Sequence, residues 1–214
     1  MEYRRPAEIE RRSMEIIGEE LAGRGIVLPA ENAAVIRRVI HTTADFDYVG
    51  NLTFTADAVE RGIRALLAGT VIVTDTNMAL AGISKPGLKR LGSHVMCYMA
   101  DVDVAERAKA EETTRAAVSV KKAAEQAPGC IYAVGNAPTA LLEMIRQMEQ
   151  GFRPALVIGV PVGFVNVVEA KEAILETCTR KGIPAIVAMG RKGGSTVAAA
   201  ICNALIYSAG ERLT

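Results

Sequence analysis

The sequence predicts an α/β protein with a doubly wound, mostly parallel sheet of about five strands, helices on both faces and a helical N-terminal segment. Three observations predict this fold. Beyond residue 70, short apolar or β-branched runs alternate with helical periodicity, as in βαβ units. Three of these runs end in a glycine-containing turn that leads into a helix. The chain before residue 70 shows only helical patterns. We expect residues 1–214 to form one domain.

Three helices are predicted in the N-terminal third, from apolar residues at helical spacing and from the residues that stop each helix. They cover about residues 7–23, 31–41 and 58–68. The second helix should end near His41, because Thr42 and Thr43 are weak helix formers that favour caps and turns.

Strands and helices alternate in the remainder of the chain. The strands are predicted at residues 71–75, 94–99, 131–134, 155–159 and 184–189. A long charged and alanine-rich helix is predicted at residues 104–126, and shorter ones at 140–150, 168–180 and 196–207. Short apolar strands that alternate with helices are typical of a parallel sheet that is buried under helices on both sides.

The composition excludes several classes of protein. Lys and Arg number 25 against 24 for Asp and Glu, so nucleic-acid binding is not expected. The four cysteines are widely spaced, and neither CxxC nor a zinc-like Cys/His cluster occurs, so no metal site is expected. No signal peptide and no apolar run of membrane-spanning length is found, which favours a cytoplasmic protein without a membrane partner.

Three glycine turns should meet at the carboxyl edge of the sheet, where open α/β folds bind ligands. They are Gly135–Thr139, Gly159–Gly163 and Gly190–Ser195. Glycine lets backbone approach a ligand closely, and the helix N-termini offer unpaired N–H groups to anions. Ordinary tight turns would also contain glycine, but three together favour an anion site with Gly135, Asn136 and Arg191 as binding residues.

His41 is one of only two histidines in the chain. In the last turn of a helix, the negative end of the helix dipole favours its protonated form, whereas Arg37 and Arg38 disfavour it. A histidine balanced in this way can give or take a proton near neutral pH. The alternative is a helix-capping histidine beside a solvated arginine pair.

Other polar residues have simpler interpretations. His94 opens a predicted buried strand and should be hydrogen-bonded in the core. Asp45 and Asp47 are placed to orient the His41 ring, although a solvated turn is the simpler interpretation. Arg115 falls inside the predicted helix 104–126 and is by default solvated or ion-paired.

Five short blocks carry a resemblance to a known family. They are RVIHT at 38–42, AVGNAPTAL at 133–141, GVPVGFV at 159–165, EAK at 169–171 and GRKGGS at 190–195. By their order and spacing, the chain resembles the precorrin-8X methylmutase family over nearly its whole length. The resemblance implies an isomerase of cobalamin biosynthesis that moves a methyl group from C-11 to C-12 of a corrinoid macrocycle, giving hydrogenobyrinate or cobyrinate. It also implies a homodimer and no organic cofactor.

The resemblance further implies roles for individual residues. His41 matches the family's proton donor and acceptor, and Ser13 and Arg38 match substrate-contacting positions. Ser84 and Arg115 are weaker matches; Ser84 stands where some relatives have threonine, which keeps the hydroxyl. The tract at residues 42–48 looks more like members of the anaerobic, early-cobalt route, which favours cobalt-precorrin-8 as substrate. Any cobalt would arrive inside that substrate.

Two other functions fit parts of the sequence. A nicotinamide- or flavin-dependent oxidoreductase on a similar sheet would need a GxGxxG turn, and the chain has neither this fingerprint nor GxxxxGK[ST]. A non-catalytic tetrapyrrole carrier would bind the same macrocycle. Because an enzyme can also retain its product, only a spectral change of the corrinoid on a single turnover separates the two.

Overall fold

A six-stranded sheet in the order β1-β6-β5-β4-β2-β3 forms the centre of the protein. The computed structural model describes residues 5–213. The strands are β1 Leu52–Phe54, β2 Ile72–Thr74, β3 Val95–Met96, β4 Ile131–Val134, β5 Leu156–Gly159 and β6 Ala185–Ala188. β1 runs antiparallel to β6, and every other pairing is parallel. The predicted mostly parallel α/β sheet is therefore confirmed, with one strand more than the five predicted.

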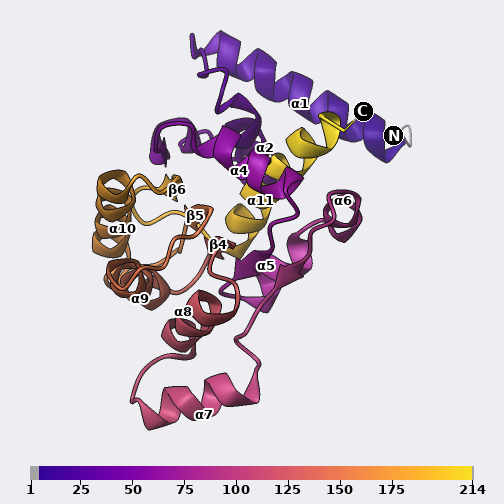
Figure 1. The fold of residues 1–214 in the computed structure, drawn as a ribbon. Coiled ribbons are helices and arrows are strands. Elements are labelled where there is room, and N and C mark those ends of the chain that lie inside the picture. The colour runs from indigo at the N-terminus through magenta and orange to yellow at the C-terminus, as the bar shows by residue number, and fades with distance from the viewer. Residues whose placement is uncertain (1–4, 214) are drawn as a thin grey trace.

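Helices cover both faces of this sheet (Figure 1). They are α1 Pro6–Gly23, α2 Ala33–Thr43, α3 Tyr48–Asn51, α4 Ala58–Leu67, α5 Asn77–Gly82, α6 Lys85–Arg90, α7 Val102–Ala110, α8 Arg115–Gln126, α9 Pro138–Glu149, α10 Val167–Lys181 and α11 Ser195–Glu211. One apolar cluster joins the sheet to α2, α4 and α11, and a second joins it to α8, α9 and α10.

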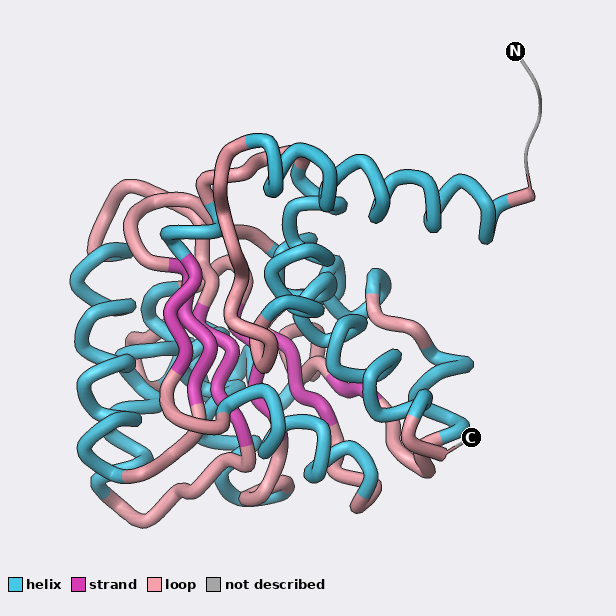
Figure 2. Tube along the Cα trace, turned by 90° about the horizontal axis from the view of Figure 1, so that it is seen from above, coloured by secondary structure: helices cyan, strands magenta, loops and turns pink. Residues whose placement is uncertain are grey.

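The strands alternate their side chains between these two clusters, as a period of two requires. In β4, Ile131 and Ala133 belong to the first cluster, whereas Tyr132 and Val134 belong to the second. On the first face, α11 is the central helix and contacts α2, α4, α5 and α6. α1 lies outside this layer against α2, and its N-terminal part projects beyond the body of the protein (Figure 2).

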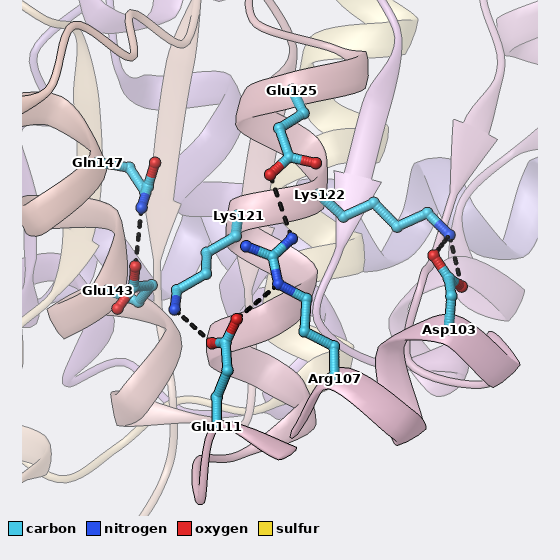
Figure 3. Close-up of polar contacts among 8 residues, drawn as sticks. All are labelled: Asp103, Arg107, Glu111, Lys121, Lys122, Glu125, Glu143 and Gln147. Atoms are coloured by element: carbon cyan, nitrogen blue, oxygen red, sulfur yellow. Dashed lines mark hydrogen bonds and ion pairs between the residues drawn. The ribbon is translucent and has the colours of Figure 1, made fainter. Parts of the chain in front are cut away.

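The predicted helix 104–126 is wrong, because α7 and α8 are separate helices. Glu112 has a left-handed φ of 50°, which ends the first helix. Thr114 then caps α8 by accepting a hydrogen bond from the N–H of Ala117 at 3.1 Å. Surface ion pairs hold the two helices together, among them Arg107 of α7 with Glu125 of α8 (Figure 3).

The prediction for His94 is also wrong, since its side chain is exposed and not in the core. The reason is that β3 is only two residues long and lies at the edge of the sheet, so His94 falls outside it. β1 was missed because three residues carry too little pattern to predict a strand. Among the described residues, no helix is long and apolar enough to cross a membrane.

Candidate active site

His41 lies in the last turn of α2 with its side chain exposed. The helix buries Ile36, Val39 and Ile40 against the core, and this leaves the imidazole on the opposite, outer side. Ala44, with a left-handed φ of 54°, ends the helix, and its N–H donates to the carbonyl of Ile40 at 2.7 Å. The predicted end of the second helix near His41 is confirmed to within two residues.

His41 and Ser13 line the same groove, which has a volume of about 440 Å³. Its walls come from α1, from the end of α2 and from Phe46, and they mix apolar with polar and charged side chains. The Arg24 guanidinium lies 4.1 Å from the centre of the Phe46 ring and adds a cation to the rim. Glu20 also lines the groove and pairs with Arg24 at 3.3 Å. The groove therefore combines an exposed imidazole, a hydroxyl and an arginine–glutamate ion pair.

Arg38 and Ser84 both lie near Tyr207, a residue of α11 that no sequence pattern had singled out. The Arg38 guanidinium lies 4.9 Å from the centre of the Tyr207 ring and pairs with Glu10 of α1 at 2.7 Å. Ser84 and Tyr207 line a second cavity of about 450 Å³. Ser84 also caps α6, because its hydroxyl accepts a hydrogen bond from the N–H of Gly87 at 3.2 Å.

Lys192 joins the third glycine turn to the segment after His41. Its ammonium binds the carboxylates of Asp45 and Asp47, each at 2.6 Å. The hydrogen bond to Lys192 lowers the pKa of Asp45, and the two carboxylates raise the pKa of Lys192. Both aspartates are thus ion-paired with a lysine in another turn. The sequence had suggested either that they orient the His41 ring or that they lie in a solvated turn, and it did not indicate this pairing.

The start of α9 is already occupied by a carboxylate of the protein. Asp75, at the end of β2 and fully buried, accepts hydrogen bonds from the N–H groups of Gly135, Asn136 and Ala137, each at 2.8 Å. Burial raises the pKa of Asp75, although the three donors oppose the shift. The prediction of unpaired N–H groups at this turn is therefore wrong. The only signal for Asp75 was an acidic residue that ends a β-branched run.

The glycines bring the turns close to one another. A Cβ on Gly135 would lie 2.7 Å from the Cα of Ser195, and one on Gly193 would overlap the carbonyl of Val160. Gly194 donates its N–H to that same carbonyl at 2.8 Å. The side chain of Arg191 projects from this packed edge over Phe164, with 5.4 Å between guanidinium and ring centre.

Arg115 is the first residue of α8, exposed, and not in the middle of a helix as predicted. The hydroxyls of its neighbour Thr114 and of Thr139 lie 3.0 Å apart, which places the starts of α8 and α9 together. The predicted residues thus form two groups: Ser13, Arg38, His41 and Ser84 around α2 and α11, and Arg115, Gly135 and Asn136 at α8 and α9. Arg191 belongs to a third region, the turn whose Lys192 binds Asp45 just after α2 and whose Ser195 lies against Gly135.

Comparison with known proteins identifies the family. A sequence profile described as precorrin-8X methylmutase matches residues 8–208. The chain belongs to the precorrin-8X methylmutase family. It is 42% identical over 210 residues to a cobalt-precorrin-8 methylmutase from Priestia megaterium, covering 98% of this chain and 91% of the relative. It is 37% identical to a precorrin-8X methylmutase from Pseudomonas aeruginosa, covering 92% and 93%.

A solved structure of the same family agrees with the fold. The precorrin-8x methyl mutase from Thermus thermophilus superposes with a TM-score of 0.85 at 40% identity and covers 95% of this chain and 98% of that one. Membership of the family makes the protein an enzyme of the isomerase class. Within the described residues, no three His, Cys, Asp or Glu side chains gather as a metal site would require.

Proposed function

We propose that the protein converts cobalt-precorrin-8 to cobyrinate by moving the C-11 methyl group to C-12, as a step of cobalamin biosynthesis. The observation that carries this proposal is the match, along nearly the whole chain, to relatives that are named cobalt-precorrin-8 methylmutase. The likeness of residues 42–48 to members of the anaerobic, early-cobalt route supports the cobalt-containing substrate over its metal-free counterpart.

His41 is the proposed proton donor and acceptor. As imidazolium it protonates the conjugated ring, which withdraws electron density and lowers the barrier to a sigmatropic methyl shift. The proton then returns to His41, so atoms and charge balance without a second reactant. Help of this kind is worth ~10²–10⁴-fold. The exposed imidazole beside Ser13 and one turn after Arg38 supports the assignment.

The proposed substrate is a large, flat, apolar ring fringed with carboxylates. Arg38, Arg115 and Arg191 are proposed to bind those carboxylates, since guanidinium groups match carboxylate geometry. Phe164, 82% exposed beneath the Arg191 side chain, offers an apolar surface to the ring. Ser13 and Ser84 are proposed as hydroxyl contacts.

The contact at Gly135 and Asn136 is proposed in a revised form. Their N–H groups are bound to Asp75, so we assign the contact to the exposed side chain of Asn136 and to the close approach that Gly135 permits. No organic cofactor is included in the proposed reaction.

We also propose that the chain acts as one domain within a cytoplasmic homodimer. Both apolar clusters pack against the same sheet, which supports a single doubly wound domain. The N-terminal part of α1 projects from the body (Figure 2). The side chains of Ile9 and Ile16 on this helix are 54% and 40% exposed. A second copy packed against this helix would cover those side chains and close the open side of the His41 groove.

The test is incubation of the purified protein with cobalt-precorrin-8 and, separately, with precorrin-8. We expect a change in the visible spectrum on a single turnover and a shifted methyl signal by NMR. His41→Asn should retain corrinoid binding and lose at least ~10²-fold in rate. Binding without any spectral change would identify a carrier instead, and full activity of the variant would remove His41 from the mechanism.

A further inference from the structure

Lys171 is a fully buried lysine in the second turn of α10, with an exposed fraction of 0%. Its ammonium donates hydrogen bonds to the carbonyl oxygens of Gly190 and Lys192, each at 2.8 Å. Both carbonyls belong to the turn that follows β6. A charged group from one helix therefore holds the backbone of a distant turn at two points.

The burial of this lysine is unusual, because lysine is almost never fully buried unless it is paired. Here its hydrogen-bond partners are carbonyl groups and not carboxylates. Burial lowers the pKa of Lys171 to about 8. An apolar side chain of similar length would avoid that cost, so the two carbonyl contacts are what this residue contributes to the protein.

The turn that Lys171 holds has little conformational preference of its own. Gly190, Gly193 and Gly194 have φ values of 71°, 158° and 133°, which residues with a side chain rarely adopt. Glycine-rich backbone samples many conformations unless other contacts restrain it. The two carbonyls bound by the ammonium lie at the start of this stretch and orient its first peptide groups.

The same turn is connected to the proposed catalytic segment. The side chain of Lys192 binds Asp45 and Asp47, four and six residues after His41. Lys192 is thus fixed through its backbone by Lys171 and reaches with its side chain to the end of the His41 helix. Ser195, at the end of the turn, also contacts Thr76 with 2.8 Å between the hydroxyl oxygens.

We propose that Lys171 is a positioning residue for the isomerisation: by binding the carbonyl groups of Gly190 and Lys192, it fixes the turn through which Lys192 holds the segment after His41. The inference rests on the proposed function, since the consequence of misplacement is a slower methyl shift. Lys171 itself does not touch the substrate.

The experiment compares Lys171→Met, Lys192→Met and the double variant with the wild-type protein. Methionine keeps the length and apolar character of the lysine stem but removes its donors. Lys109→Met, at an exposed site in α7, is the control for loss of one lysine charge. For each protein we would measure kcat at saturating cobalt-precorrin-8, the melting temperature, and hydrogen exchange of residues 190–195 at a temperature well below melting.

We expect Lys171→Met to lower kcat by ~10–100-fold, because small misplacements of this kind cost about that much. Exchange in residues 190–195 should rise while the control keeps wild-type rate and exchange. The double variant should lose no more rate than Lys192→Met alone, because both substitutions break the same connection. A purely structural lysine would lower the melting temperature and leave kcat of the folded protein unchanged.

Several outcomes overturn the proposal. One is a folded Lys171→Met protein with kcat within about twofold of wild type. Another is a double variant whose loss of kcat equals the product of the losses in the two single variants. If Lys171→Met does not fold, Lys171→Gln takes its place, because glutamine keeps a shortened donor. It should lower kcat by a smaller factor, and its combination with Lys192→Met should lose no more rate than Lys192→Met alone. An unchanged kcat of Lys171→Gln refutes the proposal. If the wild-type protein isomerises neither substrate, the proposed function fails, while unchanged exchange in residues 190–195 would refute the positioning role separately.

Discussion

Replacing Asp75 with Asn tests how the start of α9 is stabilised. Oδ1 of Asp75 accepts one backbone N–H and Oδ2 accepts two, all at 2.8 Å. Asparagine has the same shape but a single acceptor oxygen. Its best orientation keeps the oxygen facing Asn136 and Ala137 and turns the NH₂ group towards the N–H of Gly135, so two donors then face each other.

The cost can be worked out from these contacts. A hydrogen bond to a charged group is worth about 1.5–3 kcal/mol, and the two bonds that remain become neutral and weaker. Relief from burying a charge offsets part of this loss, and burial does raise the pKa of Asp75. We therefore expect a net destabilisation of about 2–3 kcal/mol, which lowers the melting temperature by about 4–12 °C in a protein of this size.

Calorimetric melting of Asp75→Asn at pH 7 provides the measurement. Asp57→Asn is the matched control, because Asp57 is exposed, makes no side-chain cap bond before α4, and has a left-handed φ of 57° that Asn accepts readily. Its melting temperature should stay within about 2 °C of wild type. An Asp75→Asn protein that melts at or above the wild-type temperature would show that burying the charge costs more than its three bonds return.

Three further predictions concern other parts of the fold. The pKa of Lys171 is about 8 when folded against an ordinary 10.5, so the unfolded chain binds more protons between these values and stability rises with pH there. Between these pH values, urea titration should show the unfolding free energy of the wild-type protein rising by at most ~3 kcal/mol more than that of Lys171→Met. A difference in unfolding free energy between the two proteins that does not change with pH would contradict this prediction. Arg107→Ala removes surface pairs from α7 and should lower the melting temperature by no more than about 3 °C, an effect that 1 M salt removes. Gly193→Ala places a methyl group against the carbonyl of Val160 and should destabilise the protein by at least ~2 kcal/mol in urea, whereas Gly25→Ala, which has open space around it, should cost less.

The sequence predicted those strands and helices whose formation depends on a local pattern of apolar residues. The β-branched runs located β2, β4, β5 and β6, and the apolar spacing of residues 31–41 located α2 and therefore His41. Each of these elements buries one face against the sheet, so its periodicity survives in the sequence. β1 and the split between α7 and α8 depend on a three-residue pairing and on a single left-handed residue, Glu112. The Thr-Thr-Arg sequence at residues 113–115 was an available cap signal for the second of these.

The contacts between turns had no local signal. Asp75 lies 60 residues before Gly135 in sequence, and Lys192 lies 147 residues after Asp45. Their pairing depends on which strands are neighbours in the sheet, which periodicity does not reveal. For the same reason, the glycines correctly indicated that another group lies close to the backbone, but they did not identify that group. At Gly135 and Gly193 the neighbouring group is another turn of the same chain.

That interlocking has an evolutionary and practical consequence. Since Gly135 and Gly193 leave no space for a methyl group between adjoining turns, a change in one turn is tolerated only with a compensating change in the turn that faces it. The three turns should therefore be inherited as a unit, with coordinated substitutions among homologues. An attempt to redesign selectivity by grafting should transplant all three together, because a single foreign turn would meet neighbours shaped for a different partner.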